Sequence, residues 1–403
     1  MVVGARATGK TTTLGRRAET IIRLDREAEA AAFVADPDAA LRGLAEPALL
    51  DEWQEVPGVL GAARRAVETA PSPNRFLLTG SVRAELENET WPGTGRLVRV
   101  SMYPMTIREQ LGDTESATFF DKLANGDELT VPADSPDLRG YVELALRSGF
   151  PMAALLLTGL PRRIWLESYL EDLLTHDVEQ LEEPATRRRD PHRLRRYFEA
   201  YALNSGGIAD HKTIYEAAGI NKLTAAAYER LLVDLLIVEQ IPAWTSNRLD
   251  RLAKQPKRYV IDPALMTAAL RVDEEGVVRD GNLLGRVLDT FVVAQLRPEV
   301  TVSSTQPRLY HLRTRSGRQE IDLVAELAGQ DLIGIEVKAS ASPNAQDARH
   351  LAWLRDALGE RFVAGVVFHT GPRLFELDER VVAAPISVLW GGSSRSGGRR
   401  SQS

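Results

Sequence analysis

Short apolar runs alternate with longer amphipathic stretches through the N-terminal part of the chain. Short apolar runs, which predict buried strands, occupy residues 21–25, 47–52 and 75–81. An Ala- and Glu-rich stretch and an amphipathic stretch at 59–68 separate these runs and predict helices. Strands that alternate with helices predict an α/β domain with a parallel sheet, whose ligand binds at the C-terminal ends of the strands.

The pattern becomes helical in the middle of the chain, from about residue 151 to 270. Bulky residues recur there at helical spacing, which predicts core positions rather than a ligand site: Trp165, Tyr169, Leu173 and Leu174. Helices are predicted at 212–219 and 223–236, followed by paired strands at 237–241 and 257–261. A helix, a turn, a second helix and a hairpin give the order of a winged-helix fold.

Strict alternation appears in the C-terminal part, where acidic and apolar residues take turns at 320–324 and 333–338. A period of two places Asp322 on one strand and Glu336 and Lys338 on the next strand on the same face of a hairpin, with the apolar residues facing a core. Two further elements are predicted after the hairpin: a helix at 344–358 and a strand at 362–368.

Composition indicates a protein of several globular domains. Its 403 residues exceed one ordinary core, and 44% are hydrophobic and 26% charged. Cys is absent, so disulfides and thiolate metal sites are excluded. The net charge of −6 excludes a chain that is basic throughout. No apolar run of membrane-spanning length and no signal peptide are found, so we expect a cytoplasmic protein with no membrane partner.

The clearest chemical signal is segment 4–11, which matches the phosphate-binding pattern G-x-x-x-x-G-K-[ST] at every fixed position. Glycines in such a loop let backbone N–H groups point at phosphate oxygens, and the next helix adds its positive N-terminal end. Lys10 is predicted to reach the β and γ phosphates of ATP, and the Thr11 hydroxyl to bind Mg²⁺. The predicted nucleotide-binding residues are Gly4, Ala5, Arg6, Ala7, Thr8, Gly9, Lys10, Thr11 and Thr12.

Acidic and small polar residues follow two of the predicted strands. Asp51 is predicted to hold Mg²⁺ through water, and Glu52 to polarise the attacking water. Because parallel strands end at the same edge, Thr79 and Ser81 would lie beside the γ-phosphate as sensors; plain turn residues are the alternative.

A charge-stabilising arginine is also expected near the nucleotide. Arg96 is the candidate and Arg83 its rival, because a guanidinium close to the γ-phosphate stabilises charge on the transferred group. An ordinary surface arginine is the alternative for each.

The strand that leads into the loop is unusually short. Only three residues precede Gly4, whereas strands average about five. We therefore expect either that the true N-terminus lies upstream of Met1 or that this strand is truncated.

The C-terminal hairpin carries the second chemical signal. Asp322 and Glu336 are predicted metal ligands for Mg²⁺, and Lys338 is predicted to position water or to stabilise phosphate charge. This D…E-x-K order resembles the PD-(D/E)XK nuclease superfamily, and Asp289 lies where that fold often has a helical acid. An active nuclease, an inactive nuclease fold used for binding, and an edge hairpin with an ionic face all stay open.

Several motifs occur in an order that resembles one large prokaryotic family. They are the phosphate loop, Leu24-Asp25, Asp51-Glu52-x-Gln54-x-x-Pro57, Leu78-Thr79-Gly80-Ser81, Gly95-Arg96 and Tyr103-Pro104-Met105-Thr106-x-x-Glu109. Over nearly its whole length the chain resembles AAA-like P-loop ATPases that carry a C-terminal domain of unknown function. In that family a further segment precedes the first strand.

This resemblance and the element pattern together predict an α/β protein of three domains and a tail. An AAA-like P-loop ATPase domain is expected at 1–150 and a helical, winged-helix-like domain at 151–280. A restriction-endonuclease-like α/β domain is expected at 281–388 and a disordered tail at 389–403.

Nucleic-acid contacts in the middle segment are only weakly indicated. Its basic cluster could neutralise phosphates, but nearby acids make a solvated face an equal alternative: Arg187, Arg188, Arg189, Arg193, Arg195 and Arg196. The helix at 223–236 offers few base-reading side chains, so a structural or protein-contact role is favoured over DNA reading.

The leading functional hypothesis is ATP binding and hydrolysis that drives or gates the C-terminal domain on DNA or RNA. One alternative is an ATP-dependent switch that binds a protein partner and keeps the nuclease fold inactive. Another is a winged-helix DNA-binding regulator. A homo-oligomer is left open, and a small-molecule kinase is disfavoured because no second substrate motif is found.

Overall fold

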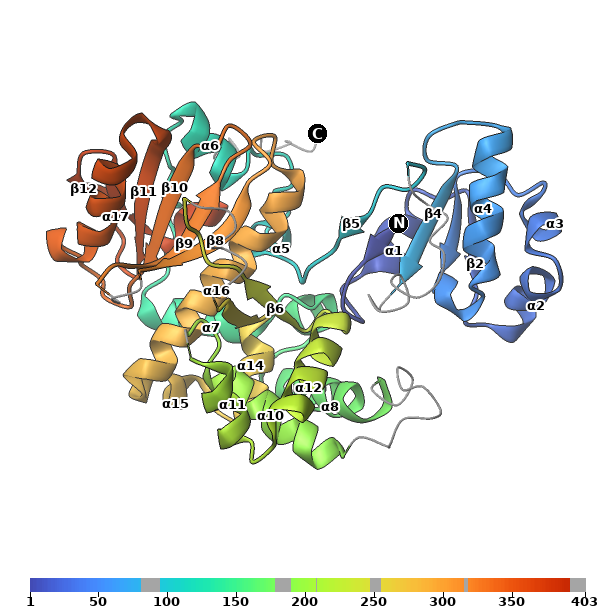
Figure 1. Cartoon of the computed structure of the whole chain (residues 1–403), viewed down its shortest axis with the longest axis horizontal. Helices are drawn as coiled ribbons and strands as arrows, with labels where there is room; N and C mark the ends of the chain where they lie inside the picture. The colour runs from blue at the N-terminus through green and yellow to red at the C-terminus, as the bar shows by residue number, and fades with distance from the viewer. Residues whose placement is uncertain (81–94, 178–189, 208, 247–254, 315–317, 392–403) are drawn as a thin grey trace, which may run out of the picture. The chain divides into compact units, whose positions relative to one another are not determined.

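The computed structural model describes residues 1–80, 95–177, 190–207, 209–246, 255–314 and 318–391. The chain divides into two compact units (Figure 1). The first unit comprises Met1–Pro104, Phe150–Met152 and Ala226–Val238, and the second comprises the rest. Among the described residues, no helix is both long enough and apolar enough to cross a bilayer.

A five-stranded parallel sheet organises the first unit, in the order β2-β3-β4-β1-β5 (Figure 1). Its strands are β1 (Val2–Val3), β2 (Thr20–Arg23), β3 (Ala48–Asp51), β4 (Phe76–Gly80) and β5 (Val100–Ser101). Its helical elements are α1 (Lys10–Gly15), α2 (Glu27–Ala35), α3 (Pro37–Leu41), the 3₁₀ turn η1 (Trp53–Glu55) and α4 (Gly58–Thr69). The predicted parallel sheet is confirmed, with β4 lying between the strand that feeds the phosphate loop and the strand that ends at Asp51.

Apolar burial explains why these segments form this sheet. Ala48, Leu49 and Leu50 of β3 are fully buried, as expected for a central strand of a parallel sheet covered on both faces. Helix α4 presents Val59 and Ala62 to the same core as Leu50. Burial of each large side chain of this kind contributes about 1.5–3 kcal/mol.

A six-stranded mixed sheet organises the C-terminal part of the second unit, in the order β12-β13-β11-β10-β9-β8. Its strands are β8 (Arg308–Arg313), β9 (Glu320–Glu326), β10 (Leu332–Val337), β11 (Phe362–His369), β12 (Phe375–Asp378) and β13 (Val381–Pro385). Strands β8, β9 and β10 pair antiparallel, and β10, β11 and β13 pair parallel. The predicted hairpin at 320–324 and 333–338 is therefore confirmed.

Helix α17 (Ala345–Leu358) packs on β10 and β11. Asn344 caps it, since its side chain accepts a hydrogen bond from the Gln346 N–H. Gly334 of β10 allows this close packing, because a Cβ there would lie 2.6 Å from Leu351 Cδ2. The predicted helix at 344–358 and strand at 362–368 are thus both present.

Helices form the remainder of the second unit. Before the sheet they are α5 (Ile107–Gln110), α6 (Phe119–Asn125), α7 (Leu138–Arg147), α8 (Gly159–Asp172), α10 (Pro191–Leu203), α11 (His211–Ala217), α14 (Pro263–Leu270), α15 (Glu274–Arg279) and α16 (Gly281–Val302). Short π and 3₁₀ turns are η3 (Met152–Leu156), η4 (Leu173–Asp177), η5 (Gly359–Arg361) and η6 (Ile386–Trp390). Gly359–Arg361 joins α17 to β11, and Ile386–Trp390 follows the last strand.

The elements predicted for a winged helix occur in the expected order: α11, α12 (Lys222–Asp234), and the paired strands β6 (Val238–Ile241) and β7 (Lys257–Val260). Most of α12 falls in the first compact unit and α11 in the second. The winged-helix assignment therefore stays a prediction.

The segment after β6 joins the C-terminal sheet within the second unit. The Trp244 N–H donates to the His311 carbonyl at 2.6 Å, and the His311 N–H donates to the Pro242 carbonyl at 3.0 Å. Strand β7 is also tied down, since the Gly206 N–H donates to the Arg258 carbonyl at 2.8 Å. These bonds tie the segment after β6 to β8, and β7 to the residues that follow α10.

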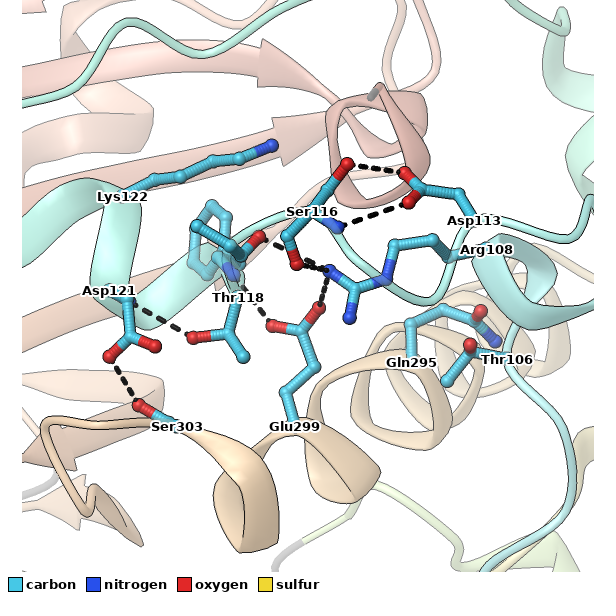
Figure 2. A network of polar contacts seen from close by, with 12 residues as sticks. Thr106, Arg108, Asp113, Ser116, Thr118, Asp121, Lys122, Gln295, Glu299 and Ser303 are labelled. Atoms are coloured by element: carbon cyan, nitrogen blue, oxygen red, sulfur yellow. Dashed lines mark hydrogen bonds and ion pairs between the residues drawn. The ribbon is translucent and has the colours of Figure 1, made fainter. Parts of the chain in front are cut away.

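Residues 105–149, predicted to belong to the ATPase domain, lie in the second compact unit. Figure 2 shows how polar side chains of this tract meet α16. The Glu299 carboxylate accepts the Phe119 N–H at 2.7 Å and pairs with Arg108 at 3.2 Å. The Ile107 N–H donates to Gln295 Oε1 at 2.7 Å. The predicted boundary at residue 150 thus differs from the division into compact units.

Two predictions about side-chain burial need correction. Leu173 and Leu174 are buried as expected, but Trp165 and Tyr169 are half-buried and stack on each other with ring centroids 5.3 Å apart. Residues 389–391, which were predicted to belong to a disordered tail, are instead buried. Residues 392–403 lie outside the described residues.

The basic cluster of the middle segment is partly described. Arg193 pairs with Asp190 at 3.4 Å, and Arg195 pairs with Glu199 at 3.4 Å and also with Glu171. These pairs favour the solvated face over a phosphate-binding patch. The run 187–189 lies outside the described residues.

Candidate functional site

The phosphate loop lies between β1 and α1 and takes the backbone shape that its glycines permit. Gly9 has φ 95° and Ala7 has φ 60°, both in the left-handed region. Gly4 is required for close packing, because a Cβ there would lie 2.3 Å from the Met102 carbonyl oxygen. The loop is therefore anchored to the segment that follows β5.

Lys10 is buried within this loop. Its ammonium donates hydrogen bonds to the carbonyls of Gly4 and Ala5, both at 2.9 Å. Burial lowers the pKa of Lys10, although Glu52 and Asp51 oppose that shift. The Thr8 hydroxyl donates to the Ala5 carbonyl at 2.9 Å and closes the turn. The structure thus places the motif lysine inside the loop, where the sequence predicted it.

Asp51, Thr11 and Thr79 meet at the C-terminal edge of the sheet. The Thr11 hydroxyl donates to Asp51 Oδ1 at 2.8 Å, and the buried Thr79 hydroxyl donates to the same oxygen. The three side chains come from α1, β3 and β4, so the parallel sheet brings them together. A hydroxyl and a carboxylate oxygen side by side are the hard oxygen donors that Mg²⁺ takes, and the residues present fit this ion.

Glu52 follows Asp51 in a strained conformation, with φ 51°. Its carboxylate accepts a hydrogen bond from Gln54 Nε2 at 2.5 Å, and its N–H donates to Thr79 Oγ1 at 3.1 Å. The turn therefore fixes both the backbone and the side chain of the predicted base. Gln54 was part of the sequence motif, but its role in orienting Glu52 was not predicted.

Thr79→Val is expected to lower kcat for ATP hydrolysis roughly tenfold to a hundredfold. Valine puts a methyl group where the Thr79 hydroxyl lies, so Asp51 and the Glu52 N–H lose the hydrogen-bond partner that they share. A buried polar group left without a partner costs about 1–3 kcal/mol. Thr79→Ser keeps the hydroxyl and should retain most of the rate. Steady-state phosphate release at saturating ATP measures both. Equal rates for Val and Ser variants would show that Thr79 is a plain strand residue.

Three other predicted nucleotide-site residues have exposed side chains. Arg6 and Thr12 are exposed on the loop and on α1. Arg96 is exposed and donates to the carbonyl of its neighbour Gly95 at 3.4 Å, so its charge-sensing role stays a prediction. Ser81 and Arg83 lie outside the described residues.

A second polar cluster lies in the C-terminal unit, where the hairpin brings the D…E-x-K residues together. The Val337 N–H donates to Asp322 Oδ2 at 3.0 Å, and Lys338 Nζ donates to Glu336 Oε2 at 2.9 Å. Asp289 joins them from α16, as the sequence suggested. The juxtaposition is as predicted, while the catalytic roles stay predictions.

Lys257 of β7 reaches into the same cluster and was not predicted from the sequence. Its ammonium donates to Asp289 Oδ2 at 2.7 Å and to Asp322 Oδ1 at 3.0 Å. The side chain is only 1% exposed. The Tyr259 hydroxyl also donates to Asp289, at 3.2 Å. The one available signal was a lysine at the start of a predicted strand, because a strand lysine that becomes buried requires an anion as partner.

Electrostatics of the cluster follow from its burial. Burial raises the pKa of Glu336 to about 8, a shift that Asp322 increases and Lys338 opposes. Burial alone would raise the pKa of Asp322, but Lys257 and Lys338 hold it below its ordinary value. Burial would lower the pKa of Lys257, yet Asp289 and Asp322 raise it well above its ordinary value. The two carboxylates therefore favour the charged form of Lys257.

The predicted Mg²⁺ ligands Asp322 and Glu336 do not fit a metal in this arrangement. Both Asp322 oxygens accept N–H donors, and one Glu336 oxygen accepts an ammonium. In the part of the chain that the structure describes, no three His, Asp or Glu side chains are grouped to hold a metal ion. The cluster opens on a hollow of about 720 Å³ between α16, α17 and the ends of β9 and β10.

Family comparisons agree with the N-terminal geometry. A family described as an AAA domain matches residues 1–111. The N-terminal part of the chain is therefore similar to AAA-type P-loop ATPase domains. Domains of unknown function, DUF8612 and DUF4143, match residues 138–276 and 284–389. Their descriptions name no activity, so the winged-helix and nuclease-like assignments downstream of the AAA domain stay predictions.

Two relatives match nearly the whole chain, and each is described as an uncharacterized protein. The chain is 26% identical over 398 residues to protein Mb2031c of Mycobacterium bovis and to protein Rv2008c of Mycobacterium tuberculosis. Each match covers 96% of this chain and 80% of the relative. The solved Walker-type ATPase PABY2304 of Pyrococcus abyssi is 14% identical, with a TM-score of 0.39 over 67% of this chain and 90% of that chain.

Proposed function

We propose that this protein binds ATP with Mg²⁺ at residues 4–12 and hydrolyses it, and that the nucleotide state controls the C-terminal domain. The observation that carries the ATPase proposal is the Thr11–Asp51–Thr79 network beside the phosphate loop. These side chains come from three segments of the chain, and their contact at one edge of the sheet supports a site for phosphate and Mg²⁺.

Each residue has a role in the proposed hydrolysis. Lys10 binds the β and γ phosphates, and Thr11 and Asp51 would hold Mg²⁺ together with phosphate oxygens. The ion would neutralise charge on the phosphates when bound. Glu52 takes a proton from the attacking water, with its carboxylate oriented by Gln54.

Lys10→Ala is expected to weaken ATP binding by about a hundredfold or more, since charge-assisted hydrogen bonds are worth about 1.5–3 kcal/mol each. Fluorescent-nucleotide titration and phosphate release measure binding and turnover. Arg17→Ala removes an exposed cation close to the same helix and should leave both unchanged. A Lys10→Ala variant with the wild-type rate would refute the site.

For the C-terminal domain, two proposals remain. In the first, a nuclease-like domain acts on DNA or RNA; in the second, an inactive nuclease fold binds a protein partner and ATP sets the switch. The Lys257 contacts with Asp289 and Asp322 favour the second. A winged-helix DNA-binding regulator also remains a proposal, supported by the order of the helices and strands. A homo-oligomer is a further proposal, because AAA-like ATPases commonly assemble as oligomers.

Cleavage assays separate the two proposals. Single- and double-stranded DNA and RNA are incubated with Mg²⁺ or Mn²⁺, with and without ATP. Wild type is compared with Lys338→Ala and Lys10→Ala. Cleavage that is lost in Lys338→Ala supports the nuclease, whereas intact ATP turnover without cleavage of any substrate supports the switch.

A further inference from the structure

We propose that Lys257 is the resident cation of the C-terminal acidic cluster, and that its ammonium excludes a divalent metal ion from Asp289 and Asp322. The inference deepens the proposed function of the C-terminal domain, and it concerns the occupant of the site rather than its activity. The lysine comes from β7, outside the sheet that carries Asp322 and Glu336.

Position is the first argument. Lys257 Nζ lies 2.7 Å from Asp289 Oδ2 and 3.0 Å from Asp322 Oδ1, so one ammonium bridges carboxylates of α16 and β9. A divalent ion shared by these two carboxylates would occupy the space that Nζ fills. The two cations therefore compete for one position.

Confinement is the second argument. At 1% exposure the Lys257 side chain is shielded from solvent. Its strand is fixed, since the Gly206 N–H donates to the Arg258 carbonyl at 2.8 Å and the Val260 N–H donates to Ser205 Oγ at 3.1 Å. Gly206 also lies against Asp289, because a Cβ there would be 2.7 Å from Oδ2. The Lys257 ammonium therefore stays beside Asp289 and Asp322 as long as β7 does not move.

Charge is the third argument. Lys257 and Lys338 supply two positive charges to the carboxylates of Asp289, Asp322 and Glu336. A divalent ion added to this set would meet two fixed cations at short range. Repulsion of that kind opposes binding of the ion, whereas a metal site normally gathers uncompensated anions.

The test uses the full chain without nucleotide, with Mn²⁺ as the probe and free Mn²⁺ measured by electron paramagnetic resonance. Wild type and Asp322→Asn should give the same isotherm, because Asp322 binds no metal. Lys257→Met should gain one Mn²⁺ site, because Asp289 and Asp322 lose the ammonium that lies between them. This site should bind Mn²⁺ at least about tenfold more tightly than the C-terminal domain of the wild type does. Lys257→Met/Asp322→Asn should lose that site again.

Matched variants control for folding. Tyr259→Phe removes another partner of Asp289 from the same strand but keeps the ammonium, so it should gain no Mn²⁺ site. Lys257→Gln can still donate to one carboxylate and replaces Lys257→Met if the methionine variant unfolds. Circular dichroism of each variant reports folding.

Two results would overturn the inference. One is a wild-type Mn²⁺ site that Asp322→Asn abolishes, a comparison that needs no change at Lys257. The other is a folded Lys257→Met or Lys257→Gln variant that gains no site. Neither result bears on ATP hydrolysis, and failure of the ATPase proposal would leave these isotherms unchanged.

Discussion

Glu52→Gln is expected to lower kcat for ATP hydrolysis about a thousandfold and to leave ATP affinity within about threefold of wild type. Glu52 follows β3 with its backbone in the left-handed region, at φ 51°. Gln54 Nε2 donates a hydrogen bond to its carboxylate at 2.5 Å. A glutamine has nearly the same shape but cannot take a proton from water. The change should therefore remove the base and keep the nucleotide pocket.

Glu55→Gln is the matched control for this prediction. Glu55 lies three positions further along and is exposed. The same loss of charge there should leave kcat unchanged. Single-turnover hydrolysis and nucleotide titration of both variants give the comparison, and a Glu52→Gln enzyme that retains a tenth of the wild-type rate or more would contradict a general-base role for Glu52.

Asp121→Asn is expected to reduce the free energy of unfolding of the second unit by about 2–4 kcal/mol. One Asp121 oxygen accepts a hydrogen bond from the Ser303 hydroxyl at 2.7 Å (Figure 2). The same oxygen accepts the Thr305 N–H at 3.0 Å, and the other accepts the Ser304 N–H at 3.1 Å. An asparagine would turn an NH₂ group toward some of these donors. The contact between α6 and the C-terminal end of α16 would then open.

The pH dependence gives a second reading of the same contact. Burial alone would raise the pKa of Asp121, but the hydrogen bonds from Ser303 and its neighbours hold the pKa below its ordinary value. A carboxyl with a depressed folded-state pKa stabilises the fold above about pH 4, and this stabilisation is lost as the pH falls below that value. Wild type should therefore lose more stability than Asp121→Asn between pH 4 and more acidic conditions.

Urea denaturation followed by tryptophan fluorescence measures these differences. Asp127→Asn is the matched control, because Asp127 is an exposed aspartate just beyond the same helix. Its unfolding should match wild type at every pH. An Asp121→Asn protein that unfolds at the wild-type urea concentration would show that the network in Figure 2 contributes no net stability.

The sequence located most of the residues that the structure brings together around the phosphate loop. This loop is contiguous, so Gly4, Gly9, Lys10 and Thr11 define it from their spacing alone. Asp51 and Thr79 could be added because parallel strands end at one edge of a sheet. A different rule applied to the C-terminal hairpin: side chains alternate between the two faces of a strand, which predicted that Asp322, Glu336 and Lys338 lie on one face.

Only the tertiary structure decided what the C-terminal cluster holds and where the compact units divide. Lys257 meets Asp289 and Asp322 across 32 and 65 positions of sequence, and no local pattern links them. Likewise Glu299 binds the Phe119 N–H across 180 positions and draws residues 105–149 into the second unit. Periodicity reports which face of an element is buried, whereas the partner of a buried charge depends on how distant elements pack.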